Sequence, residues 1–110
     1  MKLFREREMK EAVAFAADGG QALHLFAGAG AYPDAPAPFK KHKDAAHLFD
    51  QDKERLILTA KRLGVNVIHV SREGEPYQHV DLCGRPLDRA KAQCENHEPE
   101  WSLGSKRRIG

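Results

Sequence analysis

The chain has 110 residues, of which 41% are hydrophobic and 31% are charged, and its formal net charge at pH 7 is +2. This length is enough for one domain with one core, without the help of disulfides or a structural metal. The composition excludes disordered and membrane-spanning classes, since no apolar run approaches the ~20 residues that cross a bilayer. The charged N-terminus lacks a secretory signal and the two cysteines fit free thiols, so we expect a cytoplasmic protein.

The first two predicted elements are a helix and a short strand. Residues 3–17 place Met9 and Ala16 on one apolar stripe at helical spacing, which predicts an amphipathic helix that ends before a pair of glycines. Residues 22–26 (ALHLF) alternate apolar side chains around His24. This alternation is typical of a strand.

A loop is predicted between residues 28 and 39, which contain three prolines. Proline lacks an amide hydrogen, so both a helix and a central strand are disfavoured here. Glycines at the start of the loop are also found in phosphate-binding sites, but those sites lead directly into a helix, whereas prolines follow here. Basic runs at 39–43 and 106–108 make nucleic acid a possible partner.

The clearest predicted element is a helix that follows a second short strand at residues 44–49. Asp50 is the expected N-cap, and apolar residues recur at helical spacing up to Leu63. Gly64 then marks the C-terminal end, because glycine is common where a helix stops.

Residues 65–71 and 77–83 are predicted as the two strands of a β-hairpin, because both runs are rich in β-branched or alternating apolar residues. With a turn of five residues between them, His69 would lie across from His79. Asp81 would point to the same face as His79, since alternate residues of a strand share a face.

A last helix is expected to begin near Pro86 and to run to about Cys94, since proline is favoured in a first helical turn. Together these elements predict a small single α+β domain over residues 1–94. Its short mixed sheet contains the β-hairpin and packs against the two longer helices. Residues 95–110 are predicted as a loosely docked tail.

Part of this pattern resembles a known family. The run HLFDQDKERLILTAKRLGV at 47–65, followed by HVDLC at 79–83 and Arg-Ala at 89–90, is similar to short bacterial and phage proteins catalogued as a domain of unknown function. The resemblance covers roughly residues 46–92, and Val80 stands where that family has a tyrosine. It implies a shared fold but no activity, because none is known for the family. The positions that match the family's pattern are His47, Asp50, Gly64, His79, Asp81 and Arg89.

Polar residues near the ends of predicted strands are the candidates for chemistry. Imidazole and carboxylate groups can hold a divalent metal, and a histidine beside a carboxylate can act as a general base. The candidate catalytic residues are His47, Asp50, His79 and Asp81, and the candidate metal ligands are His47, His79 and Asp81. The candidate contacts for an anionic ligand are His69, His79, Asp81, Arg85 and Arg89. Simpler structural roles are also open, since Asp50 can cap a helix and His79 can pair with Asp81 at a strand end.

A second possible metal site is a zinc ion held by His79, Cys83, Cys94 and His97, which offer suitable ligand types. Residues four apart on a strand are roughly 13 Å from each other, so this site needs a sharp turn at Gly84. Cys83 could also act as a nucleophile, but the sequence offers no residue to orient His79 for that role.

Three functions stay open, and whether the protein is an enzyme depends on which is correct. The first is a small cytosolic accessory protein that binds an anionic or nucleotide-like ligand at a pocket around His79 and Asp81. The second is a metal-dependent phosphoesterase or nuclease that uses His47, Asp50, His79 and Asp81. The third is a protein-binding module without a small-molecule site, whose interface is the hairpin edge and the N-terminal helix.

Overall fold

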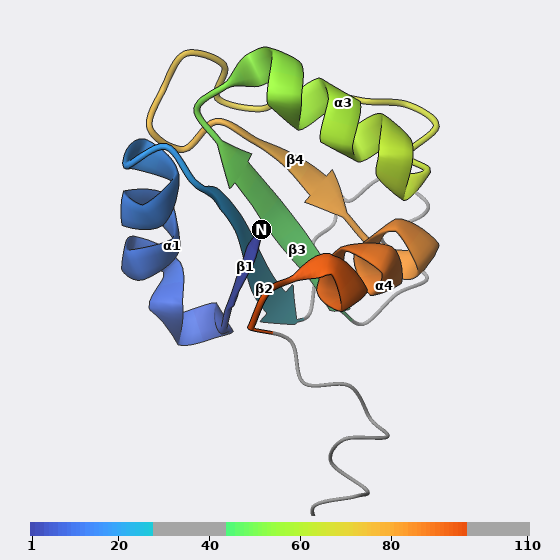
Figure 1. Ribbon diagram of the computed structural model, residues 1–110, viewed down its shortest axis with the longest axis horizontal. Coiled ribbons are helices and arrows are strands. Elements are labelled where there is room, and N and C mark those ends of the chain that lie inside the picture. Colours follow the sequence, from blue (N-terminus) through green and yellow to red (C-terminus); the bar gives the residue numbers. More distant parts are fainter. Residues whose placement is uncertain (28–43, 97–110) are drawn as a thin grey trace, which may run out of the picture.

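A four-stranded mixed sheet forms the centre of the fold (Figure 1). The structure is a computed structural model that describes residues 1–27 and 44–96. In their order across the sheet, the strands are β1 (Lys2–Phe4), β2 (Gln21–Ala27), β3 (Asp44–Asp50) and β4 (His79–Leu82). β1 runs parallel to β2, and the other neighbouring strands are antiparallel.

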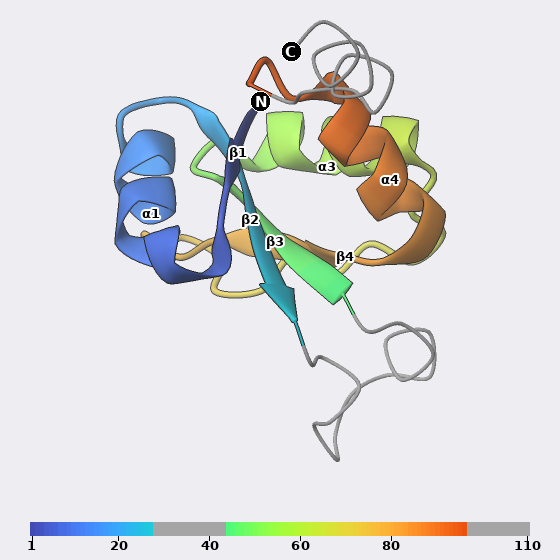
Figure 2. The ribbon, with the colours of Figure 1, turned by 90° about the horizontal axis from the view of Figure 1, so that it is seen from below.

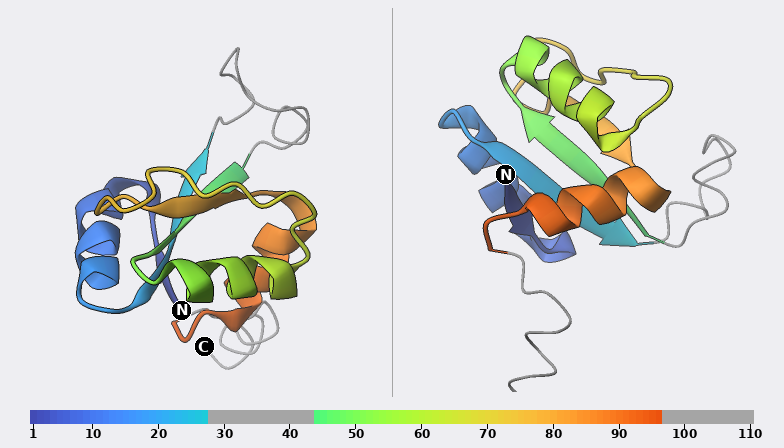
Figure 3. Two further views of the ribbon diagram at one scale, coloured as in Figure 1. Left: turned by 90° about the horizontal axis from the view of Figure 1, so that it is seen from above. Right: turned by 45° about the vertical axis from the view of Figure 1, so that its right-hand side comes forward.

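Helices pack against this sheet from two sides. The helices of the described part are the 3₁₀ turn η1 (Glu6–Glu8) and the α-helices α1 (Met9–Ala17), α3 (Lys53–Leu63) and α4 (Gly84–Gln93). Figure 2 and Figure 3 show α3 and α4 together on one face of the sheet, while α1 lies beside β1 and β2. The predicted class, a small α+β domain with a short mixed sheet, is confirmed. None of the described helices is long and apolar enough to cross a membrane.

The face toward α3 and α4 carries the larger part of the core. On β3, Ala46 and Leu48 point to this face, and alternate residues of β2 and β4 join them. The fully or almost fully buried members of this core are Leu23, Ala46, Leu48, Leu56, Ala60, Leu63, Val80, Leu82, Leu87 and Ala90. Each buried leucine stabilises the fold by about 2 kcal/mol.

The opposite face of the sheet is covered by α1 at one end only. Phe4, Ala22 and Phe49 pack there with Ala12 and Ala16 of α1, and all five are buried. The same face continues across β3 to β4, where it carries polar side chains. We call this continuation the open face.

The helix predicted for residues 3–17 is wrong over its first part. Lys2–Phe4 form β1 and pair with β2, and the α-helix begins only at Met9. Local helix propensity is weak, so the pairing of these residues with a central strand outweighs it.

The last described residues dock against β1. The Glu95 N–H donates to the Met1 carbonyl oxygen at 3.0 Å. The Asn96 side chain accepts from the Leu3 N–H at 2.7 Å and donates to the Leu3 carbonyl oxygen at 2.9 Å. The loop predicted at 28–39 and most of the predicted tail lie outside the described residues.

The predicted helix after the second strand is confirmed, but its N-cap is Asp52 rather than Asp50. The Asp52 carboxylate accepts a hydrogen bond from the Arg55 N–H at 3.1 Å, and α3 begins at Lys53. Asp50 is instead the last residue of β3 and is fully buried. Gly64 ends the helix as predicted, with a φ of 93° that glycine adopts without a steric penalty.

The hairpin predicted from residues 65–71 and 77–83 is wrong. β4 pairs with β3, and the segment 65–71 contributes only one isolated bridge, between Ser71 and His79. Several apolar residues of this segment are partly buried against the larger core, so their pattern reflects packing rather than strand pairing. The helix that follows is confirmed, although α4 begins two residues before Pro86.

Candidate metal centre

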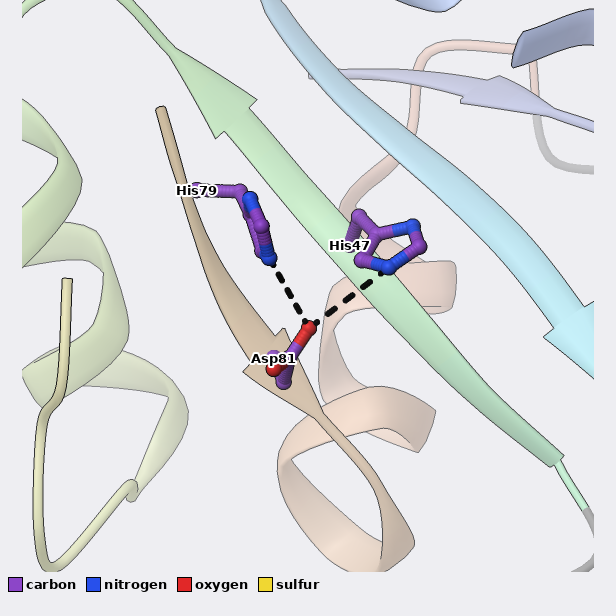
Figure 4. A group of neighbouring side chains, drawn as sticks. All are labelled: His47, His79 and Asp81. Atoms are coloured by element: carbon purple, nitrogen blue, oxygen red, sulfur yellow. Dashed lines mark ion pairs between the residues drawn. The ribbon is translucent and has the colours of Figure 1, made fainter. Parts of the chain in front are cut away.

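Three polar side chains meet on the open face of β3 and β4 (Figure 4). His47 lies opposite Asp81 in the antiparallel pair, and His79 shares the face of Asp81 because the two are separated by one residue. One possible ligand atom from each residue lies within 4.8 Å of the other two. The Nε2 atoms of His79 and His47 are 3.3 Å and 3.8 Å from Asp81 Oδ1. The group therefore has the ligand types and the spacing to hold a metal ion.

Asp81 Oδ1 is the atom that both histidines face. It is buried, and no described residue gives it a hydrogen bond of acceptable geometry, although His79 Nε2 is only 3.3 Å away. The side chain as a whole is 41% exposed, so the site is open to solvent at this residue. A buried carboxylate oxygen is costly unless a proton or a cation accompanies it.

His79 is oriented by the main chain. Its Nδ1 lies 2.6 Å from the Tyr77 carbonyl oxygen. A carbonyl oxygen can only accept, so His79 Nδ1 carries a proton in this arrangement. In the neutral ring the lone pair is then on Nε2, the atom that faces Asp81.

His47 is enclosed by rings. The Phe26 ring stacks on it with 4.3 Å between the centroids, and His24 lies next to it with 3.2 Å between the two Nδ1 atoms. His24 is buried, and its Nε2 is 2.8 Å from the Glu6 carbonyl oxygen. The sequence alone identifies His24 only as part of a strand, because its neighbour in the adjacent strand is set by a register that no local pattern reveals.

The surroundings shift the two histidine pKa values in opposite directions. Burial, and next the nearby His79, lower the pKa of His47 to about 4, although the charge of Asp81 opposes this shift. Burial also acts to lower the pKa of His79, but its contacts with Asp81 and the Tyr77 carbonyl outweigh burial and raise that pKa. At neutral pH, His47 is therefore uncharged, and as the pH falls His79 gains a proton before His47 does.

Replacing His47 with phenylalanine is expected to make the protein less sensitive to acid. The pKa of His47 is about 4 in the folded state against 6.5 ordinarily, so the unfolded chain gains a proton first as the pH falls. Between pH 7 and pH 4.5, the free energy of unfolding of the native protein should therefore fall by about 2 kcal/mol more than that of the variant. The contribution of His47 to stability is lost as the pH drops from 6.5 to 4. Urea unfolding at both pH values measures this difference, and equal losses in the two proteins would contradict it.

Asp50 lies apart from the other three candidate catalytic residues. It has no exposed surface, and both of its oxygens are 2.7 Å from guanidinium nitrogens of Arg55. Gln21 Nε2 and the Asp52 N–H also donate to it, each at 2.9 Å. These contacts explain Asp50 as a structural residue that joins the end of β3 to α3.

The remaining candidate ligand contacts are spread over two places. His69 is exposed on the segment before β4 and is not part of the group. Arg85 and Arg89 line a cavity of about 640 Å³ together with Asp81, between the end of α3 and the start of α4. Arg89 also donates to the Leu63 carbonyl oxygen at 3.0 Å. The cavity thus places two cationic side chains beside one member of the group.

The alternative zinc site receives no support from its described members. Cys94 is buried, and its thiol donates to the Ala90 carbonyl oxygen at 3.3 Å. Burial raises the pKa of Cys94 to about 11, which disfavours the thiolate that zinc needs. Within residues 1–27 and 44–96, neither Cys83 nor Cys94 belongs to a group that could hold a metal ion. His97 lies outside the described residues.

Comparisons with known proteins add no relative: no family model matches the sequence, and no curated protein or solved structure shows significant similarity to it.

Proposed function

We propose that this protein binds a divalent transition-metal ion through His47, His79 and Asp81 and uses it to hydrolyse phosphate esters. The observation that carries this proposal is the buried Asp81 Oδ1, which faces the Nε2 atoms of two histidines and has no hydrogen-bond donor among the described residues. A metal ion between these three atoms would satisfy the carboxylate and both lone pairs at once.

The ligand set favours some metals over others. Two imidazoles and one carboxylate suit zinc, iron, cobalt or nickel, whereas magnesium and calcium prefer sites built from oxygen atoms alone. Three protein ligands also leave a coordination position free, which is typical of catalytic rather than structural zinc sites. The partial exposure of the Asp81 side chain, 41%, leaves room for a water molecule or a substrate there.

Phosphate is the substrate class that fits the surroundings. Without a metal, the uncharged His47 ring beside the acidic side chain of Asp81 offers an anion little attraction. A divalent ion reverses this local charge, and Arg85 and Arg89 line the adjoining cavity. The anionic ligand predicted from the sequence is then a substrate bound to the metal. Binding of such a ligand without hydrolysis is the second candidate, and it is favoured by the same cavity.

Metal binding tests the first half of the proposal. The protein is dialysed against EDTA and titrated with Zn²⁺ by calorimetry and with Co²⁺ by visible absorption, and we expect one ion per chain with the spectrum of a site containing nitrogen and oxygen ligands. Asp88→Asn, which changes an exposed aspartate of α4, is the matched control and should bind as tightly as the native protein. No saturable binding of either ion would refute the proposal.

Hydrolysis of bis(p-nitrophenyl) phosphate tests the second half. Activity of the metal-loaded protein that EDTA removes and added Zn²⁺ restores would support a phosphoesterase. Saturable metal binding without hydrolysis with Zn²⁺, Mn²⁺, Co²⁺ or Ni²⁺ would reject the hydrolase and leave the metal-dependent binding of an anion. The cytoplasmic location, the resemblance to bacterial and phage proteins and a role in binding a protein partner stay predictions.

A further inference from the structure

We propose that His24 is a positioning residue, which holds His47 in the tautomer that points a lone pair at the metal. This inference rests on the proposed metal function and adds a residue to it that makes no contact with the ion. His24 is 3% exposed and lies directly opposite His47 in the pairing of β2 with β3.

The hydrogen bonds of His24 begin at a group that can only accept. The Glu6 carbonyl oxygen lies 2.8 Å from His24 Nε2, so this nitrogen carries a proton. In a neutral imidazole only one ring nitrogen carries a proton, so the other nitrogen, Nδ1, can then only accept.

The protonation of His24 then determines that of His47. The two Nδ1 atoms are 3.2 Å apart, and the ring planes are within 5° of parallel. Since His24 Nδ1 accepts, His47 Nδ1 must donate. The neutral His47 ring therefore has its lone pair on Nε2, the nitrogen that faces Asp81 Oδ1 at 3.8 Å.

Without His24, the opposite tautomer of His47 would be favoured. Asp81 would then attract a proton to His47 Nε2, because this is the ring nitrogen that faces the carboxylate, at 3.8 Å. That proton would occupy the position of the metal. His79 is protected from the same outcome by the Tyr77 carbonyl oxygen, which binds its Nδ1 proton. Thus His24 and the Tyr77 carbonyl oxygen each bind the Nδ1 proton of one histidine ligand, which leaves the lone pair of that ligand on Nε2.

Two substitutions separate positioning from packing. His24→Leu fills the buried position with an apolar side chain and removes the acceptor. His24→Asn keeps an acceptor near the position of Nδ1. We expect His24→Leu to weaken Zn²⁺ binding about 10- to 100-fold, and His24→Asn to stay within a few-fold of the native protein. Thermal melting of each variant checks that it is folded.

The tautomer of His47 is measured directly by ¹⁵N NMR of the imidazole rings in the metal-free protein at pH 8. We expect the Nδ1–H form in the native protein and in His24→Asn, and the Nε2–H form in His24→Leu. An Nε2–H form of His47 in the native protein would overturn the inference even if every variant failed to fold. Unchanged affinity and tautomer in His24→Leu would also overturn it, while metal binding itself would stand. If the native protein binds no metal, the proposed function fails, and the NMR result alone decides whether His24 sets the tautomer.

Discussion

Replacing Asp81 with asparagine is expected to lower the affinity for Zn²⁺ by at least about 100-fold. The amide keeps the shape of the side chain but removes the negative charge that two histidine nitrogens face within 3.8 Å. Stability should change by no more than about 1 kcal/mol, because Asp81 Oδ1 has no hydrogen-bond donor to lose among the described residues. The pKa of His79 should fall, since the contact with Asp81 is one of the causes that raise it.

Calorimetric titration with Zn²⁺ and urea unfolding measure the two effects on the same protein samples. Asp88→Asn, at an exposed position of α4, controls for the loss of one negative charge. The two explanations of the His79–Asp81 pair predict opposite results. If the pair is only structural, the Asp81→Asn variant should be less stable than the native protein and should bind Zn²⁺ equally well. That outcome would show that Asp81 is not a metal ligand.

Replacing Asp50 with asparagine is expected to destabilise the protein by about 3 kcal/mol. Asp50 has no exposed surface, and its carboxylate receives the Arg55 guanidinium on both oxygens, each at 2.7 Å. An amide of the same size leaves no cavity, but it loses the charge pair and turns an NH₂ group toward donors such as Gln21 Nε2.

The nearby Asp52→Ala is the matched comparison for this measurement. It removes the N-cap of α3 on the protein surface and should cost only about 1 kcal/mol. Zn²⁺ affinity should be unchanged in both variants when it is measured below their unfolding transitions, since neither residue belongs to the metal group. A loss of stability under 1 kcal/mol for Asp50→Asn would contradict the structural role given to it.

The parts of the fold that could be predicted from the sequence are those specified by local chemistry. Gly64 ends α3 because its φ of 93° suits glycine, and the alternation of polar and apolar residues in β4 is visible in the residues themselves. The predicted N-cap, Asp50, lies two residues before the observed one, Asp52, because aspartate is a good cap at either position. Only the contacts of the folded chain show that one of them is buried against Arg55.

The candidate site was partly predictable for the same reason. The spacing of His79 and Asp81 puts them on one face of any strand, and the structure places them so. Their meeting with His47 depends on the register between β3 and β4, which lie more than 25 residues apart in the sequence. The role of His24 depends in turn on the register between β2 and β3. Such registers are set by packing across the whole sheet, so no short motif contains them.

The side chain of Asn96 has a consequence for how copies of this chain meet. The outer rim of a sheet normally offers its free amide and carbonyl groups as a template on which a second chain can extend the sheet. Here the outward-facing groups of Leu3 are already bound by a carboxamide from 93 residues further along the chain. A second chain that pairs with the edge of β1 must first displace that carboxamide. The last residue of the described chain therefore blocks aggregation at the N-terminal strand.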